Sequence, residues 1–186
     1  MLEMKNISKA FGVVRALNDA SLKVDKGEIV ALLGANGSGK STLIKILGGA
    51  VHSDAGTIHI DGKEVKMRGS DASRRLKIAV AYQELSLLPL MTVCENVMLG
   101  HFLKDKFGSV DEKANKAYVG SLFKKYNITC GLDEYPSNLP PSVLSMIEIV
   151  KAISWKPDIL LLDEVTATLH HTEVELLFKN LRELAE

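Results

Sequence analysis

The sequence predicts an α/β domain that begins with antiparallel strands and carries a helical insertion. Two continuous apolar runs, residues 28–34 (EIVALLG) and 158–164 (DILLLDE), are typical of buried strands in a parallel sheet. Residues 57–65 (TIHIDGKEV) alternate around Asp61-Gly62, a dipeptide that favours the tight turn of a β-hairpin. Helical patterns dominate from residue 85 to residue 155. Strands that flank a helical block therefore indicate an α/β core with an inserted helical subdomain.

The remaining elements fit one domain of 186 residues. Short strands are predicted at residues 2–8, 17–29 and 78–83, and helices at residues 40–49, 93–103, 111–127, 142–154 and 172–186. The last helix is amphipathic, with Val174, Leu177, Phe178 and Leu181 on one face. We expect residues 1–84 and 156–186 to form the core and residues 85–155 to form the helical subdomain.

Composition narrows the class of protein. Lys+Arg and Asp+Glu both number 23, and this zero net charge argues against a bulk electrostatic nucleic-acid binder. The N-terminal residues lack the apolar segment of a secretory signal, and no apolar run is long enough to span a bilayer. Cys94 and Cys130 form no CxxC pair, which predicts two reduced, partly buried thiols in a cytosolic protein. Any membrane association is therefore expected to go through a partner.

Residues 34–42 (GANGSGKST) match the pattern G-x-x-x-x-G-K-[ST] between a predicted buried strand and a predicted helix. Its glycines let the backbone curl so that N–H groups point at phosphate oxygens, and the helix start adds its positive dipole end. Lys40 supplies a cation for the β- and γ-phosphates, and the Ser41 hydroxyl is a ligand for Mg²⁺. The predicted phosphate-binding residues are Gly34, Asn36, Gly37, Ser38, Gly39, Lys40, Ser41 and Thr42.

The apolar strand at residues 158–164 ends in Asp163 and Glu164. If this strand runs parallel to residues 28–34, Asp163 comes to lie beside the phosphate loop, where a carboxylate holds Mg²⁺ directly or through water. Glu164 adds a carboxylate that polarises an attacking water. The structural alternative is a strand end followed by an acidic helix cap.

The pair of acids also separates classes of phosphate-loop protein. A small GTPase needs an Asn-Lys-x-Asp guanine reader, but the Asn115-Lys116 dipeptide is followed by Ala117 and Tyr118. Small-molecule kinases need no base aimed at water. Hydrolysis of a nucleoside triphosphate fits the sequence better.

These motifs resemble the nucleotide-binding domain of ATP-binding cassette (ABC) transporters, through nearly the whole chain. Residues 2–49, residues 82–100 (YQELSLLPLMTVCENVMLG), residues 146–153 (MIEIVKAI) and residues 158–169 carry the resemblance. Within the family the chain is most similar to ATPase subunits of bacterial monosaccharide importers of the ribose, galactose or xylose type. The fold that this implies is a P-loop NTPase (RecA-like) core with an antiparallel β subdomain and a helical subdomain.

The resemblance implies a role for each matching residue. Phe11 lies where the family places an aromatic ring against adenine, although plain core packing is the alternative reading. Gln83 is the glutamine-loop residue that reaches Mg²⁺ or the attacking water and couples the site to the membrane subunits. Asp163 supports Mg²⁺, and Glu164 is the catalytic base. The implied ligands are ATP and Mg²⁺.

The chain departs from the family in the signature that contacts the γ-phosphate bound by an opposing domain. The family reads Leu-Ser-x-Gly-Gln there, whereas Leu139 is followed by Pro140, Pro141, Ser142 and Val143. Proline has no N–H to donate and fixes φ. Ser142 is expected to serve as N-cap of the following helix. The helix would then survive while its contact with the other domain is lost.

Other departures lie near the end of the chain. Val165 replaces a usual proline, and His170 replaces a small polar residue in the loop that pairs across the dimer. His170 and the adjacent His171 are expected to be solvated rather than metal ligands. The family continues past residue 186 into a further strand and a switch histidine, so we expect a core that lacks these C-terminal strands. Importers of this type usually carry two cassettes, and the chain resembles the first.

Two hypotheses follow. The first is an ABC-type ATPase domain that couples MgATP hydrolysis to sugar uptake, with permease subunits and a second nucleotide-binding domain as partners, on the cytoplasmic face of the membrane. The second is a module that binds MgATP but hydrolyses it negligibly, which the altered signature and the missing switch histidine favour. An incomplete fragment is a third possibility.

Overall fold

The computed structural model describes residues 1–67, 69–82 and 84–185. The chain forms two compact units. Unit 1 comprises Met1–Ile78 together with the residues from Arg182 on, and unit 2 comprises Ala79–Leu181. Each unit has its own hydrophobic core, and the predicted functional residues divide between them.

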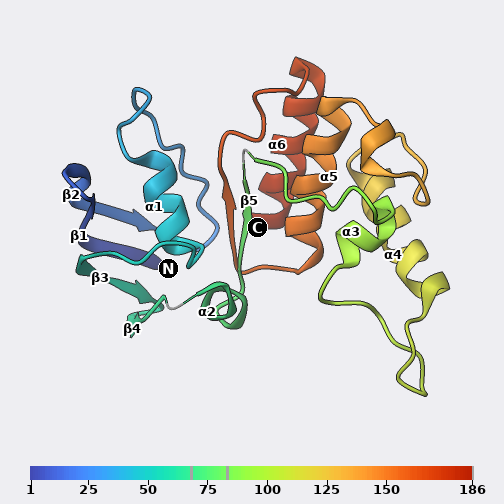
Figure 1. The fold of residues 1–186 in the computed structure, drawn as a ribbon, viewed down its shortest axis with the longest axis horizontal. Helices are drawn as coiled ribbons and strands as arrows, with labels where there is room; N and C mark the ends of the chain where they lie inside the picture. The colour runs from blue at the N-terminus through green and yellow to red at the C-terminus, as the bar shows by residue number, and fades with distance from the viewer. Residues whose placement is uncertain (68, 83, 186) are drawn as a thin grey trace. The chain divides into compact units, whose positions relative to one another are not determined.

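Unit 1 is built on a four-stranded antiparallel sheet with the order β2-β1-β3-β4 (Figure 1). Its elements are β1 (Leu2–Phe11), β2 (Val14–Val24), α1 (Lys40–Leu47), β3 (Ala55–Ile60), β4 (Lys63–Val65) and α2 (Ser70–Arg75). Asp61 and Gly62 both have positive φ, 48° and 76°, as a type I′ turn requires. The predicted antiparallel β portion and its hairpin are confirmed.

The sheet packs one face against α1, which contacts β2. Apolar side chains of β1 alternate into the core, so that Leu2 and Met4 are buried while Glu3 is only partly covered. From the helix, Leu43, Ile44, Ile46 and Leu47 are all buried. Packing on the sheet therefore fixes the orientation of the helix that follows the phosphate loop.

Unit 2 is mainly helical, with β5 and β6 paired in a two-stranded sheet. Its elements are β5 (Ile78–Ala81), α3 (Val93–Met98), α4 (Glu112–Lys125), a 3₁₀ turn (Pro136–Asn138), α5 (Pro141–Ser154), β6 (Ile159–Leu162) and α6 (His171–Ala185). Helix α5 packs against α3, α4 and β6. The predicted helical block and its two flanking strands are confirmed.

Helix α5 is the centre of the core of unit 2. Ile147, Ile149 and Val150 are fully buried, and the polar residues Ser145, Glu148 and Ser154 of the same helix are buried with them. Polar caps define the neighbouring helices. Thr92 and Glu95 form a reciprocal capping box at the start of α3.

Both cysteines are free thiols, and burial raises the pKa of Cys130 to about 11.

The structure corrects the prediction of a buried strand at residues 28–34. The segment forms no strand, and Ile29, Val30 and Leu33 are exposed, Leu33 to 91%. A strand of a parallel sheet takes its backbone hydrogen bonds from neighbouring strands. Within the described part of the chain, none of the named strands pairs with these residues. An apolar run alone therefore did not decide the backbone conformation.

Smaller differences concern element limits. Strand β2 starts at Val14 and ends at Val24, rather than covering residues 17–29. In α6, Leu177 and Leu181 are buried as the amphipathic pattern predicts, whereas Phe178 is 38% exposed and Asn180 is buried. Among the described residues, no helix is long and apolar enough to cross a bilayer.

Candidate functional site

The predicted phosphate loop, residues 34–42 of unit 1, leads directly into α1, which starts at Lys40 as expected. Gly37 has φ 82°, and Gly39, the N-cap of α1, has φ 93° and ψ 2°. Side chains with a Cβ rarely adopt these left-handed conformations, whereas glycine does so at little cost. The Gly39 carbonyl accepts the N–H of Leu43 at 2.9 Å, the first bond of the helix. The glycines therefore allow the chain to curl and enter the helix within a few residues.

Close contacts show how tightly this loop is packed at two of its glycines, and at Gly39 the contact is with backbone that cannot move aside. A Cβ on Gly34 would lie 2.7 Å from the Ser38 hydroxyl oxygen. A Cβ on Gly39 would lie 2.6 Å from the Ala16 carbonyl oxygen. Both distances are shorter than any normal contact of a carbon atom. A glycine-rich turn that leads directly into a helix is typical of a site for a phosphate group.

Lys40 folds back over the loop that precedes it. Its ammonium donates hydrogen bonds to the carbonyl oxygens of Gly34 and Ala35, at 2.9 and 3.1 Å. An ammonium has three N–H donors, so one remains for an incoming anion. The cation therefore lies at the mouth of the loop, and Ser41 follows it in the first turn of α1.

The β1–β2 hairpin brings Phe11 close to the same end of α1. Phe11 pairs with Val14, and Lys9 pairs with Leu17. Ala16 and Leu17 are the residues that a Cβ on Gly39 would strike. The hairpin end that carries Phe11 thus adjoins the helix start, and the residue is 49% exposed. Such exposure is unusual for an aromatic ring whose only role is core packing.

In unit 2, the predicted carboxylates lie directly after β6. The Asp163 N–H donates to the Ala81 carbonyl at 2.9 Å, which fixes Asp163 beside the end of β5, and the residue is only 4% exposed. Burial, and secondly the negative charge of Asp163, raise the pKa of Tyr82. A carboxylate this deeply buried needs cations or donors around it.

Glu164 adopts φ 53°, a left-handed conformation that residues with a side chain seldom adopt. Its carbonyl accepts the N–H of Ala167 at 3.1 Å, so the chain turns sharply after the carboxylate pair. Val165 is 4% exposed and belongs to the core of unit 2, which anchors this turn. The Thr168 hydroxyl lies 2.7 Å from that of Ser145, and this hydrogen bond connects the loop to α5.

The start of α5 differs from the prediction. The N-cap is Pro140, no side chain makes a capping hydrogen bond, and Pro141 is the first helical residue. Ser142 therefore lies inside the helix and is not its cap. Proline suits the first helical position because its φ is already helical and no N–H is lost there. The helix starts without a hydroxyl or glycine at the positions where the family signature has them.

A buried polar cluster joins α5 to the segment after β5. Glu148 is 2% exposed and accepts hydrogen bonds from the Ser86 hydroxyl at 2.7 Å and the Ser86 N–H at 3.2 Å. The Lys151 ammonium donates to the Ser86 carbonyl at 3.0 Å. Burial lowers the pKa of Lys151, and the charge of Glu148 opposes that change. Sequence patterns missed this cluster because its members are more than 60 residues apart.

Gln83 lies outside the described residues. His170 directly precedes α6 and His171 is its first residue: the His170 N–H donates to the Glu173 carboxylate at 2.8 Å, and His171 lies 3.5 Å from Glu175. These contacts give the two histidines roles at the start of a helix.

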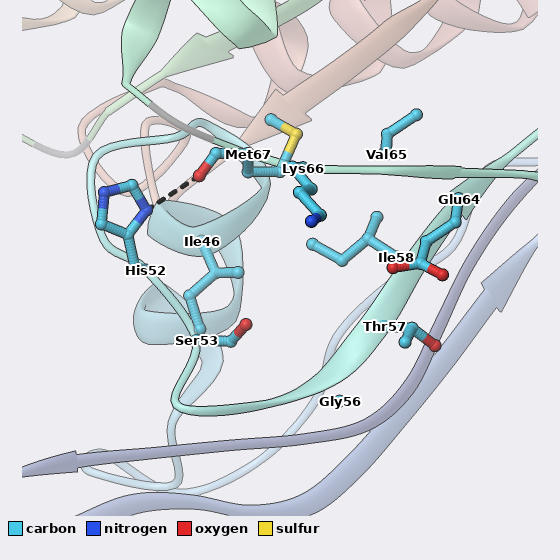
Figure 2. Close-up of a pocket in the computed structure, with 10 residues that line it drawn as sticks. All are labelled: Ile46, His52, Ser53, Gly56, Thr57, Ile58, Glu64, Val65, Lys66 and Met67. Carbon is cyan, nitrogen blue, oxygen red and sulfur yellow. Dashed lines mark hydrogen bonds between the residues drawn. The ribbon is translucent and has the colours of Figure 1, made fainter.

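A hollow of about 260 Å³ lies elsewhere in unit 1, between the loop after α1 and the β3–β4 hairpin (Figure 2). His52 Nδ1 lies 2.8 Å from the Met67 carbonyl oxygen, and because a carbonyl only accepts, the histidine is the donor. Glu64 and Lys66 carry the charges around it. None of the predicted nucleotide-binding residues lines this hollow.

Comparison with known families shows to which class of phosphate-loop protein the chain belongs. The family model described as ABC transporter matches residues 17–167. The chain belongs to the ABC transporter family. The matched range includes the predicted phosphate loop, the start of α5 and both acids after β6, so all three segments belong to the part of the chain that the family model describes.

The ABC chain is similar to proteins named ribose import ATP-binding protein RbsA. It is 42% identical to that of Hahella chejuensis over 99% of its length, and 41% identical to that of Clostridium tetani over 98%. It spans only 37% and 36% of those two relatives. The chain thus spans little more than a third of the length of these curated relatives.

Solved structures agree with this fold. The ATP-binding cassette MJ0796, in a dimeric post-hydrolysis state bound to ADP and Pi, has a TM-score of 0.88 and 26% sequence identity, over 100% of this chain and 83% of that one. A nucleotide-free cassette from an ABC transporter has a TM-score of 0.84 and 25% identity, over 99% and 76%. The predicted P-loop cassette fold is confirmed.

Proposed function

We propose that this chain binds MgATP and hydrolyses it as the nucleotide-binding domain of a bacterial sugar importer. The phosphate loop is the observation that carries the proposal. Its glycines leave room where a Cβ would collide, and the Lys40 ammonium spans its mouth. That arrangement binds the β- and γ-phosphates through backbone N–H groups and one cation. The residues concerned are Gly34, Asn36, Gly37, Ser38, Gly39, Lys40, Ser41 and Thr42.

Phe11 supports adenine as the base. An exposed ring beside the start of α1 offers a flat apolar face at the end of the loop where the nucleoside would extend. The relatives named as ATP-binding proteins for ribose import agree with an adenine nucleotide. Base stacking thus adds to the affinity that the phosphates provide.

Mg²⁺ fits the oxygen ligands that the chain offers, namely the Ser41 hydroxyl, Asp163 and the Gln83 amide. When bound, the ion neutralises charge on the phosphate oxygens. Glu164 is the base that takes a proton from the attacking water.

The partners follow from the relatives' names and from the family. A ribose import protein implies permease subunits, and MJ0796 was solved as a dimer. We propose that this chain works with permease subunits and a second nucleotide-binding domain on the cytoplasmic face of the membrane, which it reaches only through these partners. No role in nucleic-acid binding is proposed.

A second candidate function is MgATP binding with negligible hydrolysis. Pro140 and Pro141 favour it, because a start of α5 without their N–H groups is a poor donor to a γ-phosphate in another domain. Steady-state phosphate release from the purified chain separates the two. We expect the wild type to release phosphate, and we expect Glu164→Gln to lower this rate at least about 100-fold, because a general base contributes a factor of that size. Binding of MgATP with release no faster than in Glu164→Gln would instead establish the binding-only function.

A further inference from the structure

The last residues of β1 lie beyond the end of strand β3. The two strands pair from Leu2 with Ile60 as far as Ser8 with Ala55, and β3 begins at Ala55. Asp54 then continues the hydrogen bonding. Its N–H donates to the Ser8 carbonyl at 2.8 Å, and its carboxylate oxygen Oδ2 accepts the N–H of Ala10 at 2.7 Å. A side chain thus takes the place of the next strand residue, directly before Phe11.

The other carboxylate oxygen of Asp54 holds Lys9. Asp54 Oδ1 accepts a hydrogen bond from the Lys9 ammonium at 2.6 Å. The same ammonium lies over the ring of Phe11, 5.5 Å from its centroid. A cation over an aromatic face is attracted by the electrons of the ring, and desolvation strengthens the attraction. The Lys9 side chain is only 15% exposed, so it is well shielded from water.

These contacts hold the Lys9 ammonium against the Phe11 ring. The ammonium lies over one face of the ring, and the residue as a whole is still 49% exposed, which leaves part of it accessible to a flat partner. The turn that follows cannot provide this order by itself, since Val13 is fully exposed. Asp54, Lys9 and Phe11, which we call the β1-end clamp, therefore act as one unit.

We propose that Asp54 and Lys9 are positioning residues that hold the Phe11 ring ready to stack on the nucleobase of ATP. This inference rests on the proposed function and names residues outside the phosphate loop that affect affinity. Neither residue needs to touch the nucleotide. Without them the ring must be ordered during binding, which weakens affinity for the base and leaves affinity for the phosphates unchanged.

Two ligands, one with a base and one without, separate the contribution of the base to affinity from that of the phosphates. Calorimetry measures dissociation constants of MgATP and of magnesium tripolyphosphate for each variant. We expect Phe11→Ala to weaken MgATP about tenfold through lost stacking. Asp54→Ala and Lys9→Met should each weaken MgATP about threefold, because an unordered side chain must then be immobilised. All three should bind tripolyphosphate as the wild type does.

A double-mutant cycle shows whether Asp54 acts through the ring. In the Phe11→Ala background, Asp54→Ala should cause no further loss of MgATP affinity. Asp61→Ala is the matched control, since Asp61 is also an ion-paired carboxylate of the same sheet, bound to the N-terminal amine at 2.8 Å at the opposite end of β1. It should leave both dissociation constants unchanged. Asp54→Asn provides a milder variant if Asp54→Ala unfolds.

Each contrary result has one meaning. The positioning role is overturned if Asp54→Ala weakens the binding of both ligands equally. It is also overturned if the loss of MgATP affinity in Asp54→Ala adds in full to the loss in Phe11→Ala. A loss in Phe11→Ala combined with unchanged binding in Asp54→Ala and Lys9→Met overturns it as well, and leaves the proposed function standing. If Phe11→Ala binds MgATP as tightly as the wild type, the adenine contact itself is wrong, and the inference fails with it.

Discussion

Asp54 shows how one side chain determines local structure that no motif reveals. It bonds to Ser8, Lys9 and Ala10, residues more than 40 positions earlier in the chain. Its hydrogen bond with Lys9, and next that with the Ala10 N–H, hold the pKa of the Asp54 carboxyl below its ordinary value of 3.8. The ionised form is therefore the one that the folded chain favours.

This pKa shift predicts a pH dependence of stability. A carboxyl with a lower pKa in the folded chain stabilises it above the unfolded value, about 3.9, and the gain disappears as pH falls through the folded value. We expect Asp54→Asn to lower the urea midpoint at neutral pH. The difference from the wild type should shrink below about pH 4. A difference that stays constant down to about pH 2 would show that the charge of Asp54 contributes nothing.

The phosphate loop shows how an element was predictable from local sequence. Its conformation depends on glycines at fixed spacing and on a helix that starts at once, and all of these lie within residues 34–42. The apolar run at residues 28–34 was not predictable in the same way, because its strand state depends on neighbours elsewhere in the chain. Ser142 was misplaced for a related reason: Pro141 already takes the first helical position.

Two glycines of the loop provide a matched pair of substitutions. Gly37 and Gly39 both have positive φ, but a Cβ on Gly37 meets nothing within 4 Å, whereas one on Gly39 collides with Ala16. Gly37→Ala should cost about 1 kcal/mol of unfolding free energy from its backbone alone. Gly39→Ala should cost about 1 to 3 kcal/mol more, as overpacking does. Urea titration measures both, and equal losses would contradict the close packing of α1 on β2.

At the scale of the whole molecule, the fold class and the family followed from the sequence, whereas the contacts that support the site did not. The phosphate loop and the acids Asp163 and Glu164 are continuous motifs, so they were found by inspection. The Asp54–Lys9 pair and the Ser86–Glu148 pair join distant segments, and only the three-dimensional structure reveals them. Supporting residues of this kind have no spacing rule.

Affinity for MgATP tests the central claim most directly. Calorimetry on the purified chain should show MgATP binding that Lys40→Ala abolishes, because we propose the ammonium beside Gly34 and Ala35 as the cation for the phosphates. Gly120→Ala, in α4 of unit 2, serves as a control that should retain binding, because a Cβ there meets only Leu132 at an ordinary 3.8 Å. No binding by the wild type, or binding that Lys40→Ala leaves unchanged, would contradict a nucleotide site in this loop.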